Sequence, residues 1–258
     1  MIEVIYFDKD LIVINKPAGV SVHAGPTVRG QTLVDFLLEK FPEISGVGDD
    51  SQVRPGIVHR LDKDTSGVMV VARNQKSFGA LKDLFKKRLV EKIYWAIVCG
   101  RPRSSSGVIS LPIGRKVKNP TLRGVEEGKS KIRGAREAVT EYRVLKGGEK
   151  YSFLELRPRT GRMHQLRVHM KAIGHPVACD KVYGGKNVCC PAFAGRSRFD
   201  GRRPEGVNRQ LLHAKSISFS FPAHDMGEAR PDGRPEGRRL HFEADPPEDF
   251  AIVERGVL

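Results

Sequence analysis

The chain has 258 residues, of which 45 are lysine or arginine and 30 are aspartate or glutamate, so its formal net charge is +15 at pH 7. A hydrophobic content of 39% and a charged content of 29% are typical of a globular protein with a sizeable core. No apolar run approaches the roughly 20 residues of a membrane helix, and no secretory signal is visible. These features exclude a membrane protein and predict a cytoplasmic one.

The basic excess predicts a polyanionic partner, and nucleic acid is the first candidate. The alternative is that the charge only keeps the chain in solution. The four cysteines are Cys99, Cys179, Cys189 and Cys190. None forms a C-x-x-C pair, which argues against a zinc site. The adjacent Cys189 and Cys190 are therefore expected to be free thiols in a reducing compartment.

The N-terminal third predicts two short strands over residues 3–7 and 11–15, joined by a polar turn. Thr32 followed by Asp35 resembles a capping box at the start of a helix, whose apolar stripe extends as far as Phe41. A strand over residues 68–72 comes next. Asn74 is placed to cap a second helix, which has Phe78, Leu81 and Phe85 on one face.

Further strands are predicted over residues 93–98, 151–156 and 216–221. A helix is predicted over residues 163–172, with Gly174 and Pro176 ending it. Three stretches have no apolar period and are expected to be irregular: residues 117–136, residues 195–209 and the tail after Phe221. The mixture predicts an α+β fold with a largely antiparallel sheet.

In the predicted organisation one domain spans residues 1–222. An irregular extension over residues 223–258 packs on that domain, and no separate N-terminal RNA-binding module precedes it. We expect the chain to be a monomer.

The segment His59-Arg60-Leu61-Asp62-Lys63-Asp64-Thr65-Ser66-Gly67 is the most informative part of the sequence. Asp62 lies between cationic side chains just before a Thr-Ser-Gly turn. One interpretation is a surface turn whose charges cancel. The other is a carboxylate kept ionised in a cationic pocket, where it acts on an anionic polymer. Asp64 is the rival carboxylate, but its position favours capping of the turn.

Two further segments carry candidate functional groups. Tyr94 follows Lys92 in a predicted strand, where its ring either belongs to the core or stacks on a nucleobase. Residues 159–169, Arg-Thr-Gly-Arg-Met-His-Gln-Leu-Arg-Val-His, lead into a predicted helix. The start of such a helix favours anions, although the segment is also compatible with an exposed basic face. Its two histidines lack a third ligand for a metal.

In this order, the segments resemble the motifs of the RluA-type pseudouridine synthases, over residues from about Glu3 to Phe221. The resemblance implies that uridine is isomerised to pseudouridine in RNA, without cofactor or metal. It also implies a pseudouridine synthase-like fold, in which a central mixed, mostly antiparallel sheet is flanked by helices and loops and crossed by a catalytic cleft. The matching segments are 11–19, 59–67, 92–96, 160–169, 174–176 and 212–214.

The resemblance assigns three catalytic residues. Asp62 matches the catalytic aspartate, Tyr94 the tyrosine that packs against the target base, and Arg167 the basic residue that pairs with the aspartate. Arg60 matches an arginine that helps to open the RNA around a flipped base. The remaining substrate-binding candidates are His59, Thr65, Arg162, His164 and Gln165.

Asp62 has two possible roles in this chemistry. It either traps or stabilises the electron-poor sugar, or it removes a sugar proton to give a glycal. The segments over residues 111–119 and 134–142 resemble the branch that acts on large-subunit ribosomal RNA more than the tRNA branch. A non-catalytic RNA-binding or ribosome assembly factor is the alternative from another class. A nuclease or metal hydrolase is disfavoured, because both carboxylates lie beside cations.

Overall fold

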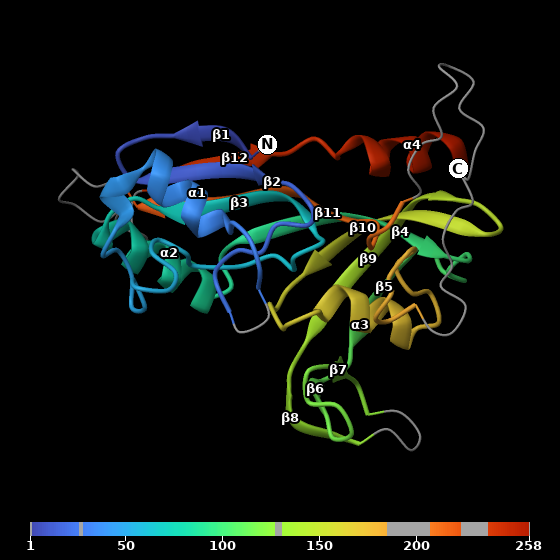
Figure 1. Cartoon of the computed structure of the whole chain (residues 1–258). Coiled ribbons are helices and arrows are strands. Elements are labelled where there is room, and N and C mark those ends of the chain that lie inside the picture. The colour runs from blue at the N-terminus through green and yellow to red at the C-terminus, as the bar shows by residue number, and fades with distance from the viewer. Residues whose placement is uncertain (1, 26–27, 127–130, 185–206, 223–236, 258) are drawn as a thin grey trace, which may run out of the picture. The chain divides into compact units, whose positions relative to one another are not determined.

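The computed structural model describes residues 2–25, 28–126, 131–184, 207–222 and 237–257. Its backbone divides into two compact units, one formed by residues 1–92 and 214–245 and the other by residues 93–213 and 246–258. Each unit combines strands with helices, and the strand pairs with a determined register are antiparallel (Figure 1). The predicted α+β class with mostly antiparallel sheets is confirmed.

The first unit is organised around a buried strand pair. β1 (Glu3–Phe7) and β2 (Leu11–Lys16) form the expected hairpin. Its turn is fixed by Asp8, whose Oδ1 accepts the backbone N–H groups of Asp10 at 2.9 Å and Leu11 at 2.8 Å. β2 pairs antiparallel with β3 (Ser66–Ala72), and all seven residues of β3 are buried. Their nearly continuous apolar runs suit strands that are covered on both faces.

The other side of β3 is occupied by β11 (Leu212–Pro222), which in turn pairs with β12 (Gly237–Glu243). Gly67 permits the close approach of β3 to β11. A Cβ atom at this position would lie 2.2 Å from the carbonyl oxygen and 2.6 Å from the nitrogen of Ala214. Its φ of +119° is also a conformation that other residues rarely adopt. The glycine of the Thr-Ser-Gly turn is therefore required by packing.

Both predicted helix caps of this unit are confirmed. α1 (Leu33–Lys40) begins with a capping box, in which Thr32 Oγ1 accepts the N–H of Asp35 at 3.3 Å and the Asp35 carboxylate accepts the N–H of Thr32 at 2.7 Å. α1 ends before Phe41, which is its C-cap residue and leads into the short 3-10 helix Pro42–Ile44. In α2 (Gln75–Lys86), Asn74 Oδ1 accepts the N–H of Ser77 at 2.9 Å.

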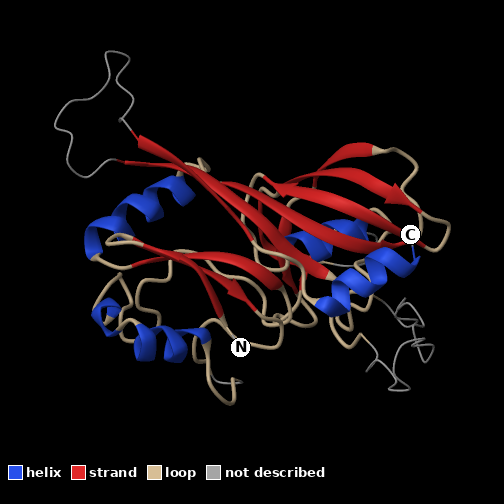
Figure 2. Cartoon of the chain, turned by 90° about the horizontal axis from the view of Figure 1, so that it is seen from above, coloured by secondary structure: helices blue, strands red, loops and turns tan. Residues whose placement is uncertain are grey.

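The second unit contains four antiparallel strands with a helix on each face. In sheet order they are β4 (Glu91–Cys99), β10 (Tyr151–Pro158), β9 (Val139–Gly147) and β5 (Ser106–Ser110). Side chains alternate between the faces of a strand. Leu154 and Leu156 pack against α3 (Gln165–Ala172), and Phe153 packs against α4 (Glu248–Val257), which Figure 2 shows alongside the strands next to the C-terminus.

A small three-stranded sheet lies beside α3 in this unit (Figure 1). It is formed by β6 (Ile113–Lys116), β7 (Arg123–Gly124) and β8 (Ile132–Arg136). The prediction that residues 117–136 are irregular was therefore wrong for β7 and β8. These strands are rich in arginine and glycine, and only pairing with β6 organises them. Ile113 and Val125 supply the apolar contacts with Val168 of α3.

The stretch after Phe221 was also expected to be irregular, and its described part is not. β12 pairs with β11 along its whole length, and α4 buries Phe250 and Val253. Residues 195–206, predicted to be a loop, lie outside the described part of the chain, whereas residues 207–209 have no regular structure. Short amphipathic elements of this kind are stabilised by tertiary packing more than by their own propensity.

The described cysteines are not free thiols. Cys99 and Cys179 are each disulfide-bonded, and Cys179 has a φ of +60°. Disulfides persist mainly in oxidising compartments, so these two residues do not support the expected reducing environment. Cys189 and Cys190, on which that expectation was based, lie outside the described residues.

We predict that Gly67→Ala destabilises the chain strongly, because the new methyl group meets the β11 backbone and the residue must keep a positive φ. The expected loss is at least about 3 kcal/mol, measured by urea unfolding. Gly79→Ala in α2 is the matched control, since a Cβ there meets no atom within 4 Å. It should stabilise by about 0.5–1 kcal/mol. Equal effects of the two substitutions would contradict this account of the turn.

Candidate active site

The Asp62 segment forms a tight turn that enters β3 in the first unit. The carbonyl oxygen of Asp62 accepts the N–H of Thr65 at 3.1 Å. Asp62 is half-buried, Arg60 is exposed, and Thr65 is 2% exposed. The turn therefore leaves Asp62 partly exposed and Arg60 exposed at the surface. Thr65 is enclosed by the fold, and its predicted role in substrate binding stays a prediction.

Lys16, at the end of β2, anchors this turn from inside. Its side chain is fully buried, and its ammonium group donates to the carbonyl oxygens of Pro17 at 2.8 Å, Val20 at 2.9 Å and Lys63 at 3.0 Å. The backbone N–H of Gly19 donates to the same Lys63 carbonyl at 3.0 Å. The carbonyl of Lys63, the residue after Asp62, thus accepts two hydrogen bonds, one from Lys16 and one from Gly19. This role was not predicted from the sequence, because Lys63 is 47 residues away from Lys16.

His59 is part of the packing beneath the turn. Its Nε2 accepts the backbone N–H of Val70 at 3.0 Å, and its ring stacks on Phe85 with centroids 4.7 Å apart. Burial, followed by the positive charge of Lys92, lowers the pKa of His59 to about 3. The imidazole is therefore neutral at physiological pH and holds β3. This engagement supports a structural role for His59 more than the predicted contact with substrate.

His23 lies near Arg60 and was not among the residues predicted from the sequence. Burial, followed by the charges of Arg60 and Arg54, lowers the pKa of His23, while Asp50 acts in the opposite direction. His23 Nδ1 is buried and has no hydrogen-bond partner in the described part of the chain. His23, in the loop after β2, therefore lies near two positive charges, those of Arg54 and Arg60 in the segment before Asp62.

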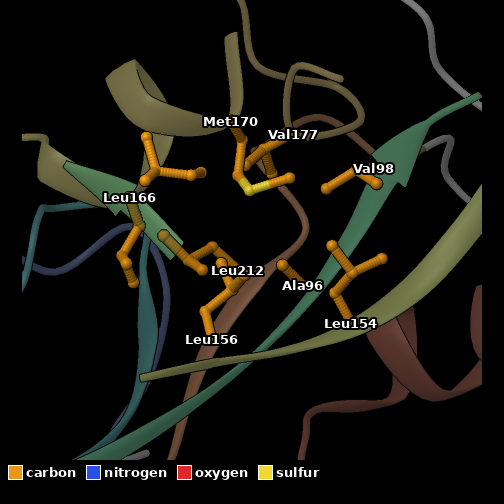
Figure 3. Close-up of a cluster of buried hydrophobic side chains, with 9 residues drawn as sticks. Ala96, Val98, Leu154, Leu156, Leu166, Met170, Val177 and Leu212 are labelled. Carbon is orange, nitrogen blue, oxygen red and sulfur yellow. The ribbon is translucent and has the colours of Figure 1, made fainter. Parts of the chain in front are cut away.

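Tyr94 lies on β4 in the second unit, on the strand face that it shares with Ala96 and Val98. It is half-buried and packs against the cluster formed by those residues with side chains from β10 and α3. Figure 3 shows Leu166 and Met170 of α3 pointing into this cluster. Burial of each such large apolar side chain contributes about 2 kcal/mol. The tyrosine ring therefore rests on a rigid base.

The loop before α3 is shaped by Gln165, which is 4% exposed. Its Oε1 accepts hydrogen bonds from Thr160 Oγ1 at 2.7 Å and from the N–H of Arg162 at 2.9 Å. Its Nε2 donates to the Val139 carbonyl and to Thr140 Oγ1, both at 3.0 Å. An amide side chain offers about four such bonds, and all are made within the protein. Gln165 therefore holds the loop, and its predicted contact with substrate stays a prediction.

Of the two histidines in this segment, His169 is completely engaged within the protein. Its Nδ1 lies 2.9 Å from Thr140 Oγ1 and its Nε2 lies 2.9 Å from the Leu111 carbonyl oxygen. Burial lowers the pKa of His169, so the ring is neutral. Because a carbonyl only accepts, Nε2 carries the hydrogen. Neither ring nitrogen is left for a metal.

Arg167 is 5% exposed and forms a bidentate ion pair with Asp180, which is fully buried. Its Nε lies 2.7 Å from Asp180 Oδ2 and its Nη2 lies 2.9 Å from Oδ1. Asp180 Oδ1 also accepts the N–H groups of Val182 and Tyr183 at 2.9 and 3.0 Å. Burial raises the pKa of Asp180, but these bonds and the Arg167 charge hold it below its usual value.

The partner of Arg167 in its own unit was not found from the sequence, because Asp180 is 13 residues away and follows an irregular stretch. The predicted pairing of Arg167 with Asp62 stays a prediction. The remaining candidates lie at the start of α3. Arg162 is half-buried, and its Nε donates to the Glu137 carbonyl at 2.9 Å. His164 is the N-cap residue of α3, with a φ of +57°.

With this geometry established, comparison with known proteins identifies the family. The family profile of RNA pseudouridylate synthase matches residues 10–172. The chain belongs to this family. It is 42% identical over 224 residues to an uncharacterized RNA pseudouridine synthase of Synechocystis. The aligned region covers 86% of this chain and 62% of that protein.

A second relative is the ribosomal large subunit pseudouridine synthase D of Borreliella burgdorferi, 44% identical over 183 residues, 71% of this chain and 55% of that protein. The chain thus spans about three fifths of the length of these two relatives. Among solved structures, the human RNA pseudouridylate synthase domain containing 4 matches with a TM-score of 0.70 and 28% identity. That match covers 98% of this chain and 92% of the human one. The predicted fold class is therefore confirmed.

No group of three or more histidine, cysteine, aspartate or glutamate side chains in the described part of the chain is arranged to hold a metal ion. None of the described helices is long and apolar enough to cross a membrane.

We predict that Lys16→Met destabilises the first unit by about 3 kcal/mol, since it leaves three carbonyl groups without their buried donor. Lys76→Met, at an exposed position of α2, is the control and should change the stability by less than about 0.5 kcal/mol. Hydrogen exchange at the amides of residues 62–66 should rise in the Lys16 variant. Unchanged protection there would show that Lys16 does not hold the turn.

We predict that Asp180→Asn costs about 3–5 kcal/mol at neutral pH, because Arg167 then lies buried without a counter-charge. The folded-state pKa of Asp180 is lowered, so its stabilisation is complete above about pH 4 and is lost as the pH falls through the folded-state value. The difference in unfolding free energy between wild type and variant should therefore shrink in acid. Asp245→Asn is the control, because that side chain is 98% exposed. A pH-independent difference for Asp180→Asn would contradict the ion-pair account.

Proposed function

We propose that this chain isomerises specific uridines to pseudouridines in structured RNA. One observation carries the proposal. Asp62, in the family motif, lies on a turn that the buried Lys16 anchors through the carbonyl of the next residue, Lys63. Such anchoring lets a half-buried carboxylate keep one position while a base is brought to it. The net charge of +15 supports an RNA substrate.

In the proposed reaction the bond between C1′ of the ribose and N1 of uracil breaks, and a bond from C1′ to C5 forms. The proton displaced from C5 is lost and N1 gains one, so the product is an isomer of the substrate. Asp62 either adds to C1′ of the electron-poor sugar and later leaves it, or removes a sugar proton to give a glycal. Neither route needs a metal or a cofactor.

The other roles follow from the environment of each residue. Tyr94 has a firm apolar base and a partly exposed ring, which suits it to support the detached uracil while it turns. Arg60 is exposed beside the turn, which suits it to fill the space left by a flipped base. Arg167 is held in place by Asp180. Its positive charge therefore has a fixed position, which suits its predicted role of keeping the Asp62 carboxylate ionised.

For the substrate we propose large-subunit ribosomal RNA. The name of the Borreliella relative, a ribosomal large subunit pseudouridine synthase, is consistent with this substrate. The resemblance of the segments over residues 111–119 and 134–142 supports it as well. tRNA is the alternative substrate. A cytoplasmic, monomeric enzyme remains our proposal for its cellular state. The third possibility is a non-catalytic RNA-binding or assembly factor, and the presence of Asp62, Tyr94 and Arg167 together argues against it.

We predict that Asp62→Asn abolishes pseudouridine formation, by at least about a thousandfold, while RNA binding changes less than threefold. The substitution removes the negative charge but keeps the shape of the side chain. Release of tritium from RNA labelled at C5 of uridine measures turnover, and filter binding measures affinity.

Asp64→Asn is the matched control, two residues away on the same turn, and should retain most of the turnover. Large-subunit ribosomal RNA and total tRNA, both unmodified, serve as parallel substrates. Turnover by Asp62→Asn at the wild-type rate would exclude the catalytic assignment. Turnover on tRNA alone would exclude the ribosomal substrate.

A further inference from the structure

An open hollow of about 410 Å³ lies across three strands of the second unit. It is lined by residues 106–108 of β5, residues 141–143 of β9, and Glu155 and Arg157 of β10. None of these residues is assigned to the proposed reaction. Concave places with a few polar groups are where proteins bind ligands, so the hollow is a candidate for a second binding site.

The hollow lies on the side of the sheet that α4 partly covers. Side chains alternate along β10, so Glu155 and Arg157 share a face with Phe153, which packs against α4. Leu156 points to the other face, toward α3, and Tyr94 packs on that same cluster. The hollow is therefore separated by the sheet from the face that carries Tyr94.

The strand register brings charged side chains together in the hollow. Arg143 of β9 is the cross-strand partner of Glu155, and Glu141 is the cross-strand partner of Arg157. On the edge strand β5, Val108 continues the row of Glu141 and is exposed. The hollow thus combines alternating charges with one exposed apolar side chain.

Glu155 is the buried member of this cluster. Only 11% of its side-chain surface is exposed, against 60% for Arg143 and 49% for Arg157. Its Oε1 accepts hydrogen bonds from Arg157 Nε at 2.9 Å and Nη2 at 2.8 Å, and Arg143 Nη2 lies 3.3 Å from both carboxylate oxygens. The negative charge is thus turned inward, and the two guanidinium groups face the solvent.

Glu141, the other carboxylate of the hollow, is neutralised by a third arginine. It accepts hydrogen bonds from Arg159 Nε at 2.8 Å and from Arg159 Nη2 at 2.9 Å. Three arginines therefore share two carboxylates, and the cluster keeps an excess of positive charge. An anionic ligand suits such a surface better than a cationic one.

The two arginines of the hollow have donors to spare. A guanidinium group carries five N–H bonds in a planar fork. Within the described part of the chain, Nε and Nη1 of Arg143 and Nη1 of Arg157 make no hydrogen bond. Guanidinium groups held in place by carboxylates match phosphate oxygens in geometry, and their flat faces stack on nucleobases.

We propose that this hollow binds a stretch of the RNA substrate other than the target nucleotide, with Arg143 and Arg157 donating to backbone phosphates. The proposal rests on the proposed function in that RNA is the partner. The net charge of +15 favours a polyanion of this kind. Because the sheet separates the hollow from Tyr94, the contact acts on the affinity for RNA and not on the chemical step.

Arg143→Gln and Arg157→Gln test the proposal when they are made singly, so that Glu155 keeps one arginine partner. Filter binding of deproteinised large-subunit ribosomal RNA between 50 and 200 mM salt is the measurement. Each variant should bind about fivefold more weakly, and the slope of log Kd against log salt should fall by about 0.8, because one phosphate contact is lost.

Arg255→Gln is the matched control. Arg255 lies on α4 in the same unit, is exposed, and pairs with Glu248 at 2.8 Å, but it does not line the hollow. Its loss should change the affinity less than twofold. An effect of Arg255→Gln equal to that of the hollow variants would show that only the total charge matters, and would overturn the proposal.

Chemical modification of arginine with phenylglyoxal, read by mass spectrometry, tests the same contact on the unaltered chain. Bound RNA should slow the modification of Arg143 and Arg157 at least fivefold and leave Arg255 unaffected. Unprotected arginines in the hollow, or variants that bind RNA as wild type does, would overturn the proposal and favour a protein partner. Absence of turnover by wild type would instead refute the proposed function, while binding and protection still decide the role of the hollow.

Discussion

A buried polar group is costly unless its hydrogen bonds are satisfied, and this constraint shapes both motif regions of the chain. The ammonium group of Lys16 meets three carbonyl oxygens, the amide of Gln165 makes four bonds, and Arg167 is matched by the carboxylate of Asp180. Each of these groups fixes backbone next to a residue assigned to the chemistry. The backbone of the motif regions is thus held in place by polar motif residues that point into the protein.

This arrangement divides the motif residues into two kinds. The polar side-chain atoms of one kind bind partners within the protein, as in His59, Gln165 and His169. Side chains of the other kind, Arg60 and Arg162, have more surface exposed to solvent. A motif is therefore not a list of substrate contacts. In each segment a few interior bonds hold the backbone, so that the remaining side chains are presented in a defined geometry.

Local signals in the sequence predicted the local structure well. The caps at Thr32 and Asn74 depend on residues three positions away, and both are confirmed. The small sheet, β12 and α4 were missed, because their stability comes from partners distant in the chain. The same reason explains why Lys16 and Asp180 were not identified, since each acts through contacts that no spacing reveals. The family motifs did identify Asp62, Tyr94 and Arg167 as candidates, but burial was needed to separate Gln165 and His59 from the surface residues.

The proposal that this chain modifies uridines in ribosomal RNA is tested most directly by a map of pseudouridines. Large-subunit RNA transcribed without modification would be incubated with the purified chain and sequenced at single-nucleotide resolution. The account predicts pseudouridine at one or a few defined uridines and none in a sample without protein. A map with no new pseudouridine, from a chain that binds the same RNA, would contradict it and favour a binding role.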